Sequence, residues 1–141
     1  VAAGATEIDI VISIGKFLEG NYQEVFDEIA EIKAAIKDAH LKVILETGAL
    51  KTAENIYKAS ILAMAAGADF IKTSTGFSTG GATREDIRLF SENVDSSLKI
   101  KAAGGIASIK DAEDMLSLGA ERLGTSRIVK IAKAESNITG Y

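Results

Sequence analysis

The sequence predicts an α/β fold of the (β/α)8-barrel, or TIM-barrel, class, and three observations predict it. Short runs of β-favouring residues alternate with longer helical patterns, which is typical of a parallel sheet with right-handed crossovers. A Gly-Ala step before a β-favouring run recurs at Gly4–Asp9, Gly67–Lys72 and Gly119–Gly124, as in a chain of repeated strand–helix units. Charged residues also stand in the middle of the strands, where a sheet covered by helices on both faces would be apolar.

Five strands are expected, at Glu7–Ser13, Lys42–Glu46, Asp69–Ser74, Leu98–Ala102 and Arg122–Thr125. Successive side chains of a strand point to opposite faces, so Ile8 and Ile10 share one face of the first strand and Asp9 lies on the other. Lys72 in the third strand and Lys101 in the fourth also lie opposite isoleucines. These mid-strand charges favour a closed barrel with a polar interior over an open, doubly wound sheet, which is the competing architecture.

Four helices are expected between the strands, at Tyr22–Ala39, Ala53–Ala66, Arg84–Asn93 and Ser108–Leu118. Apolar residues recur at helical spacing in the first, and the second is rich in strong helix formers. Thr83, followed by Glu85 and Asp86, predicts a helix N-cap with acidic residues in the first turn. Gly67 and Gly119 follow helices at the position where a glycine commonly ends one.

The length predicts one domain, residues 1–141, that holds only part of a barrel. A (β/α)8 barrel has eight strands and typically about 250 residues, whereas this chain has 141 residues and five expected strands. The segment Val1–Gly4 is interpreted as the tail of a preceding helix. The five strands are therefore expected to be strands 4–8 of the barrel, with the first three βα units absent and with open edges at the first and last strands.

Composition excludes several classes of function. Apolar residues make up 47% and charged residues 26% of the chain, as in ordinary globular proteins, and the net charge of −4 does not suit a nucleic-acid partner. The absence of cysteine and the single histidine, His40, argue against disulfides and a zinc site; His40 is expected at the bottom of the barrel. No apolar run approaches the roughly 18 residues of a membrane span. We therefore expect a cytoplasmic protein that binds small molecules, without nucleic acid, membrane or metal.

Lys72 is the first candidate for chemistry. It is expected near the carboxyl end of the third strand, the end at which barrel active sites are found. Burying a lysine costs free energy unless it is neutral or paired, and a neutral amine can attack a carbonyl to form a Schiff base. The alternative is a structural lysine whose ammonium reaches solvent from the strand end.

Lys101 and Asp9 are the candidates that would work with Lys72. Lys101 lies on the next strand and the same expected face, and a neighbouring ammonium disfavours protonation of its partner, which is a known route to an activated lysine. Alternatively, one of the two lysines pairs with a carboxylate such as Glu46. Asp9, also expected inside the barrel, either forms an ion pair with a lysine or acts as a general acid or base through a water.

Glycines after the last two strands predict a phosphate site. Gly104 and Gly105 follow the fourth strand, and Gly124 precedes Thr125 and Ser126 at the fifth. Small residues let backbone N–H groups approach an anion, and barrels frequently bind phosphate in the loops after their last two strands. Alternatively, these glycines only make tight turns. The Gly/Ser/Thr-rich loop 76–83 could close over a substrate and matches neither a dinucleotide nor a Walker fingerprint.

Four segments resemble the deoxyribose-phosphate aldolases, in order and at compatible spacing: Gly4–Ile12, Lys42–Gly48, Phe70–Phe77 and Lys101–Ile106. The Lys-Thr-Ser-Thr-Gly run that begins at Lys72, followed by Lys-Ala-Ala-Gly-Gly from Lys101, is specific to this family when both occur. The resemblance implies a class I aldolase on a (β/α)8 barrel that uses no cofactor. It implies reversible cleavage of 2-deoxy-D-ribose 5-phosphate to acetaldehyde and D-glyceraldehyde 3-phosphate.

The resemblance also implies roles for individual residues. Lys72 would be the Schiff-base lysine, Lys101 the second lysine that perturbs it, and Asp9 the proton-relay carboxylate that works with Lys101 and a water. The substrate and its phosphate would be held by Gly104, Gly105, Ser126 and Thr75. Because members of the family are often dimers, a homodimer is expected.

Some positions depart from the family pattern. Ala107 stands where members commonly carry Arg, and Arg127 follows Ser126 where many carry a second Ser; both changes concern phosphate affinity more than the chemistry. Tyr141 matches a functional C-terminal Tyr of some members. Two rival functions stay open at this point: a Schiff-base aldolase for another sugar phosphate, and a truncated chain that binds sugar phosphates without turnover.

Overall fold

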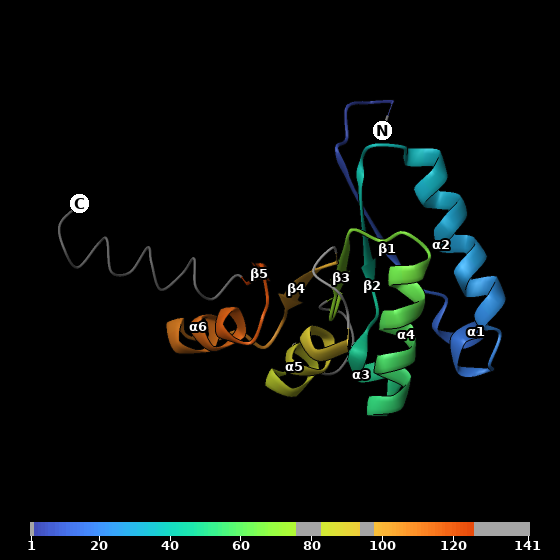
Figure 1. Ribbon diagram of the computed structural model, residues 1–141. Coiled ribbons are helices and arrows are strands. Elements are labelled where there is room, and N and C mark those ends of the chain that lie inside the picture. Colours follow the sequence, from blue (N-terminus) through green and yellow to red (C-terminus); the bar gives the residue numbers. More distant parts are fainter. Residues whose placement is uncertain (1, 76–82, 94–97, 126–141) are drawn as a thin grey trace.

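The structure is a computed structural model that describes residues 2–75, 83–93 and 98–125 (Figure 1). Within these residues, the strands are β1 (Glu7–Val11), β2 (His40–Ile44), β3 (Phe70–Lys72), β4 (Lys99–Ala103) and β5 (Arg122–Gly124). All of them pair in parallel, in the sheet order β1-β2-β3-β4-β5. The five predicted strands are confirmed, although their ends differ by a few residues.

The strand order decides between the two competing architectures. In a doubly wound sheet the order reverses at a switch point, whereas here each strand pairs with its successor in the sequence. The helices α2, α4, α5 and α6 follow one another along the sheet in chain order, each in contact with the next. The described fold is therefore a set of consecutive βα units of a (β/α)8 barrel, as predicted.

The helices of the described residues are α1 (Ile14–Leu18), α2 (Tyr22–Ile36), α3 (Thr47–Leu50), α4 (Ala53–Ala65), α5 (Arg84–Asn93) and α6 (Ile109–Ser117). The four long helices were predicted. The short helices α1 and α3 were not, because four or five residues are too few to display a helical period. The expected end of α2 at Ala39 was wrong: the helix ends at Ile36, and Lys37 follows with φ 54°.

Side-chain caps fix the starts of three of the four long helices, α4, α5 and α6, whereas α2 has no side-chain cap. The hydroxyl of Thr52 accepts a hydrogen bond from the backbone N–H of Asn55 at 3.1 Å, and that of Ser108 accepts from Asp111 at 3.1 Å. The predicted cap at Thr83 is confirmed, since its hydroxyl accepts from the N–H of Asp86 at 3.1 Å. Each such cap satisfies one of the N–H groups that a helix start leaves without an intrahelical partner.

The core lies between the helices and one face of the sheet. Leu41, Val43, Ile71, Ile100 and Ala102 are buried at this face and belong to one hydrophobic cluster with the helices. Burial of one large apolar side chain contributes roughly 1.5–3 kcal/mol. If a strand slipped by one residue, its apolar side chains would leave the core and its charged side chains would enter it. Burial of the apolar side chains therefore fixes the strand register, and this register places the charged residues on the opposite face.

The opposite face of the sheet is polar and concave. On it, Arg122 of β5 donates a hydrogen bond to Glu7 of β1 at 2.7 Å, although these are the two outermost strands. In a flat sheet, four strand spacings would separate β1 from β5 by about 19 Å, which the two side chains cannot span. The sheet must therefore curl toward this face, as a barrel wall does.

Candidate active site

Lys72 lies at the carboxyl end of β3, on the concave face of the sheet. Its side chain is 15% exposed, and its Nζ lies 3.9 Å from Oδ2 of Asp9. In a barrel, the carboxyl ends of the strands carry the reacting groups. Lys72 is thus a largely buried amine with a carboxylate beside it, at the end of the sheet where the sequence predicted it.

Lys101 occupies the position on β4 that pairs directly with Lys72 on β3. Burial lowers the pKa of Lys101 below its ordinary value, and the nearby positive charges of Lys72, Lys42 and Arg122 lower it further, while Asp9 acts in the opposite direction. Two neighbouring ammonium groups repel one another. A lysine whose pKa is lowered is a better proton shuttle near neutral pH than an ordinary surface lysine.

Asp9 stands on β1 between two lysines. Its Oδ2 lies 3.9 Å from Nζ of Lys72, and its Oδ1 lies 3.8 Å from Nζ of Lys42. The side chain is 39% exposed, so water can reach it. The structure therefore brings together the three predicted residues Asp9, Lys72 and Lys101 on one face, from three different strands.

Three further charged residues of this face, Glu7, Lys42 and Arg122, were missed as site residues by the sequence reasoning. Lys42 on β2 lies 2.6 Å from Oε2 of Glu7 and has a side chain only 7% exposed. Hydrogen bonds from Lys42 and Arg122 lower the pKa of the Glu7 carboxyl to about 2. A signal was available, because Glu7 has the same strand parity as Asp9 and Lys42 lies on the inward face of the next strand.

The segment after Lys72 is held by Glu46, which lies between β2 and α3. The hydroxyl of Thr75 donates to Oε2 of Glu46 at 2.6 Å, and its N–H donates to Oε1 at 3.2 Å. Glu46 is buried and has the left-handed backbone φ of 56°, which costs free energy for a non-glycine residue. Glu46, considered above as a partner for a lysine, thus anchors Thr75. Ser74 Oγ is buried and has no hydrogen-bond partner among the described residues.

The predicted phosphate-binding glycines make the turn that ends β4. Gly104 and Gly105 have φ of 77° and 71°, a backbone conformation that glycine adopts without strain. The N–H of Gly104 donates to the carbonyl of Gly124 at 3.3 Å, which joins the two predicted loops, whereas Gly105 is exposed. Ser126, like Arg127 and Tyr141, lies outside the described residues.

His40 lies at the amino end of β2, the bottom of the barrel, as expected. Its Nδ1 is 3.8 Å from Oε1 of Glu7.

In the described part of the chain, no group of three or more His, Cys, Asp or Glu side chains is arranged to hold a metal ion. No helix among the same residues is long and apolar enough to cross a lipid bilayer.

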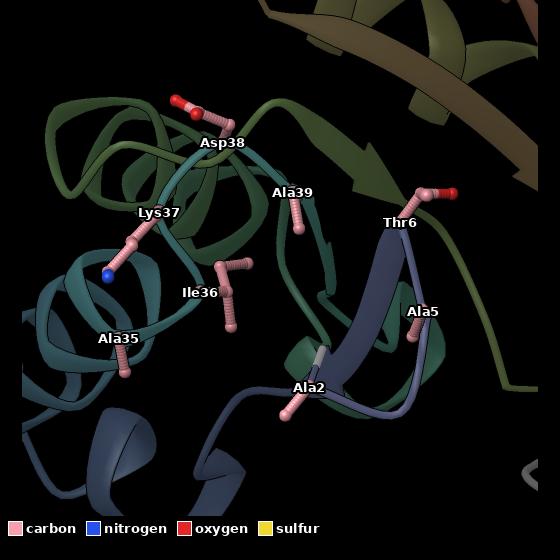
Figure 2. A pocket seen from close by; sticks show the side chains of 8 residues that line it. All are labelled: Ala2, Ala5, Thr6, Ala35, Ile36, Lys37, Asp38 and Ala39. Atoms are coloured by element: carbon pink, nitrogen blue, oxygen red, sulfur yellow. The ribbon is translucent and has the colours of Figure 1, made fainter.

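A pocket of about 590 Å³ lies at the end of the sheet opposite to Lys72, where β1 begins and α2 ends (Figure 2). Ala5, Ile36 and Ala39 point toward its middle, and Lys37 and Asp38 point away from it. None of the three candidate catalytic residues lines it. The three candidate residues lie instead on the concave face of the sheet, away from this pocket.

Known proteins are similar to this chain in sequence and in fold. The family model described as DeoC/LacD family aldolase matches residues 1–126. A deoxyribose-phosphate aldolase of Streptococcus pyogenes is 52% identical over 136 residues, and one of Clostridioides difficile is 54% identical over 132 residues. These alignments cover 96% and 94% of this chain but 60% of each relative. The chain therefore spans about 60% of the length of the curated relatives it matches.

Solved structures agree with this assignment. A structure described as a tetrameric deoxyribose phosphate aldolase from Aeropyrum pernix has a TM-score of 0.80 and 32% identity, covering 97% of this chain and 58% of that one. A structure described as QR15, an aldolase, has a TM-score of 0.86 and 38% identity, covering 99% of this chain and 64% of its own. By sequence and by fold, the chain belongs to the DeoC/LacD family of aldolases.

Proposed function

We propose that this chain carries the catalytic residues of a class I aldolase that reversibly cleaves 2-deoxy-D-ribose 5-phosphate into acetaldehyde and D-glyceraldehyde 3-phosphate. The observation that carries the proposal is the grouping of Lys72, Lys101 and Asp9 on the concave face. The substrate is inferred from relatives named deoxyribose-phosphate aldolase that are more than 50% identical to the chain.

Lys72 is the nucleophile of the proposed reaction. Its neutral amine attacks the aldehyde carbon C1 of the open-chain sugar, and loss of water gives a protonated Schiff base. A base removes the proton of the C3 hydroxyl, the C2–C3 bond breaks, and its electron pair moves toward the iminium nitrogen. D-glyceraldehyde 3-phosphate leaves, and an enamine remains on Lys72. Protonation at C2 and hydrolysis release acetaldehyde, so the iminium serves as the electron sink and the reaction uses no cofactor.

Lys101 and Asp9 are suited to the proton transfers. The pKa of Lys101 is lowered, so it lies closer to the working pH than that of an ordinary lysine. An acid or base is most effective when its pKa is near the working pH. Asp9 lies 3.9 Å from Nζ of Lys72, a separation suited to relay through a small shift or one bridging water. Together they can deliver and accept protons at the nitrogen of Lys72 and at the substrate hydroxyl.

The phosphate is proposed to bind beyond the carboxyl end of β4. Gly105 is exposed in the turn, so its N–H is the candidate donor, while the N–H of Gly104 already joins the loop to Gly124. Ser126 and Thr75 complete the proposed binding set. The proposal further includes a homodimer in the cytoplasm, and light scattering on the purified chain measures the mass of the assembly directly.

Borohydride trapping tests the proposed nucleophile. The chain is mixed with acetaldehyde, reduced, digested and analysed by mass spectrometry for an ethyl group on the Lys72 peptide. Selective labelling of Lys72, lost in Lys72→Met and kept in Lys99→Met, is expected. Lys99 is an exposed lysine of β4 and serves as the matched control. Labelling spread evenly over surface lysines would refute the role of Lys72.

Substrate turnover separates the proposal from its rivals. Release of D-glyceraldehyde 3-phosphate from 2-deoxy-D-ribose 5-phosphate, followed with a coupled dehydrogenase, is the expected activity. An aldolase for another sugar phosphate would trap acetaldehyde poorly and would release product from a different substrate. A chain that binds without turnover would show a phosphate-dependent rise in melting temperature but neither labelling nor product.

A further inference from the structure

Lys42 is a buried cation beneath the proposed reaction centre, and the mechanism above does not use it. It stands on β2 between Asp9 of β1 and Phe70 of β3. Its Nζ lies 2.6 Å from Oε2 of Glu7, 3.8 Å from Oδ1 of Asp9 and 5.6 Å from the centre of the Phe70 ring. A lysine with so little exposure needs a counter-charge to stay charged.

Glu7 supplies that counter-charge and is itself held from two sides. Arg122 reaches across the concave face to Oε1 of Glu7 at 2.7 Å, while Lys42 binds Oε2. The guanidinium of Arg122 also lies 4.5 Å from the centre of the Phe70 ring, within the range of a cation–π contact. Hydrogen bonds from Lys42 and Arg122 lower the pKa of Glu7 to about 2, so Glu7 is ionised near neutral pH and can act as the anchor of Lys42.

The two carboxylate oxygens of Asp9 face different lysines. Oδ1 of Asp9 faces Lys42 at 3.8 Å, and Oδ2 faces Lys72 at 3.9 Å. Loss of the charge on Lys42 would leave the carboxylate of Asp9 free to turn toward Lys72 with either oxygen or to move away. A fixed cation on one side thus orients the carboxylate toward the nucleophile on the other.

Lys42 also contributes to the field at Lys101. Charged groups on each of the four remaining strands of the described sheet shift the pKa of Lys101. They are Asp9 on β1, Lys42 on β2, Lys72 on β3 and Arg122 on β5. Asp9 favours the charged form of Lys101, and the three cations disfavour it.

We propose that Lys42, anchored by Glu7, is a positioning residue of this site: it orients Asp9 toward Lys72 and contributes positive charge near Lys101. The inference rests on the proposed aldolase function for the roles of Asp9 and Lys101 in turnover. The charge arrangement itself does not depend on turnover, so the two can be tested apart.

Titration of Lys101 by NMR is the test. The lysines are labelled by reductive ¹³C-dimethylation, which preserves their charge, and the Lys101 signal is assigned by its loss in Lys101→Arg. In Lys42→Met, the pKa of Lys101 is expected to rise, because one of three repelling cations is gone. In Lys42→Arg the pKa is expected to stay low. Lys99→Met, which removes a cation at the same 5.6 Å from the Phe70 ring, is the matched control and should leave it unchanged.

Trapping of acetaldehyde on Lys72 is the second readout. The labelling rate at neutral pH should fall roughly tenfold or more in Lys42→Met, and Lys42→Arg should recover most of it. The expected loss is smaller than the roughly 100-fold that a positioned acid or base contributes at the least, because Lys42 acts only through Asp9 and Lys101. If Lys42→Met does not fold, Lys42→Gln keeps a hydrogen-bond donor for Glu7 and removes the charge, with the same expected result.

Each outcome decides one of the two ideas. A folded Lys42→Met or Lys42→Gln variant in which Lys101 titrates as in the parent overturns the inference, even if Lys72 still traps acetaldehyde. If the titration of Lys101 moves as expected while the parent chain traps no aldehyde, the charge arrangement stands and the proposed aldolase function fails.

Discussion

Thr73 joins the two lysine-bearing strands, and its replacement by valine tests how much that link stabilises the chain. The side chain is fully buried. Its hydroxyl donates to the carbonyl of Ala103 at 3.1 Å and accepts from the N–H of the same residue at 3.1 Å. Thr73 directly follows Lys72, and Ala103 is the last residue of β4, so this double contact aligns the ends of both strands.

Thr73→Val removes both hydrogen bonds with almost no change in shape. Two bonds at about 0.5–1.5 kcal/mol each, together with a buried N–H left without a partner at about 1–3 kcal/mol, predict a loss of roughly 2–6 kcal/mol. Thr73→Ser keeps the hydroxyl and deletes one methyl group, which costs about 1 kcal/mol. The expected order of stability is therefore parent, then serine, then valine.

Urea unfolding followed by circular dichroism measures this order, since the free energy of unfolding falls linearly with denaturant. Most single domains have a free energy of unfolding of about 5–15 kcal/mol, so the predicted loss is easily resolved. If Thr73→Ser destabilises the chain as much as Thr73→Val, the hydroxyl does not link the strands. Acetaldehyde trapping on the folded valine variant adds a functional reading, because misaligned strand ends should slow labelling of Lys72.

Three further perturbations have expected outcomes. Glu7 has a pKa of about 2 against its usual 4.5, so it stabilises the fold above pH 4.5 and less as the pH falls toward 2; melting curves of Glu7→Gln and the parent should differ at neutral pH and converge in acid. Lys101→Leu removes a cation beside Lys72 and should shift the onset of adduct formation to higher pH; an unchanged profile in a folded variant would argue against that coupling. Gly124→Ala would place a methyl 3.1 Å from Cβ of Ala103 and 3.5 Å from Cε of Lys101. It should lower the free energy of unfolding, measured in urea, by about 1–3 kcal/mol and should slow the trapping of acetaldehyde. A variant as stable as the parent would contradict this crowding.

The strands and their faces could be predicted because the side chains of a strand alternate between its two faces, so apolar and polar residues alternate in the sequence. Asp9 between two isoleucines and Lys72 after an isoleucine indicate one polar face without any knowledge of the fold. Strand ends were less predictable. Glu46 was assigned to a strand, but β2 ends at Ile44, and Glu46 adopts a left-handed conformation that leads into α3.

The charged cluster under the site could not be predicted in the same way. The contact between Arg122 and Glu7 depends on the curl of the whole sheet, which no local pattern records. The turn at Gly104 gives a similar lesson: its glycines were visible in the sequence, but only the register of β4 and β5 reveals that its N–H donates to Gly124. The position of a residue along its strand indicates which face of the sheet it occupies. The curvature of the whole sheet determines which residues of other strands it contacts there.

The contact between Arg122 and Glu7 has a consequence for the order in which the chain matures. The two residues are 115 positions apart, so the whole segment from Glu7 to Arg122 must leave the ribosome before they can meet. Contacts of such long range form late, because a large loop must close first. Until then, Glu7 lacks the hydrogen bond from Arg122, and the charge pattern beneath the lysines is unfinished. A nascent chain can therefore bury its core on the helical face well before its reactive face acquires its final electrostatics.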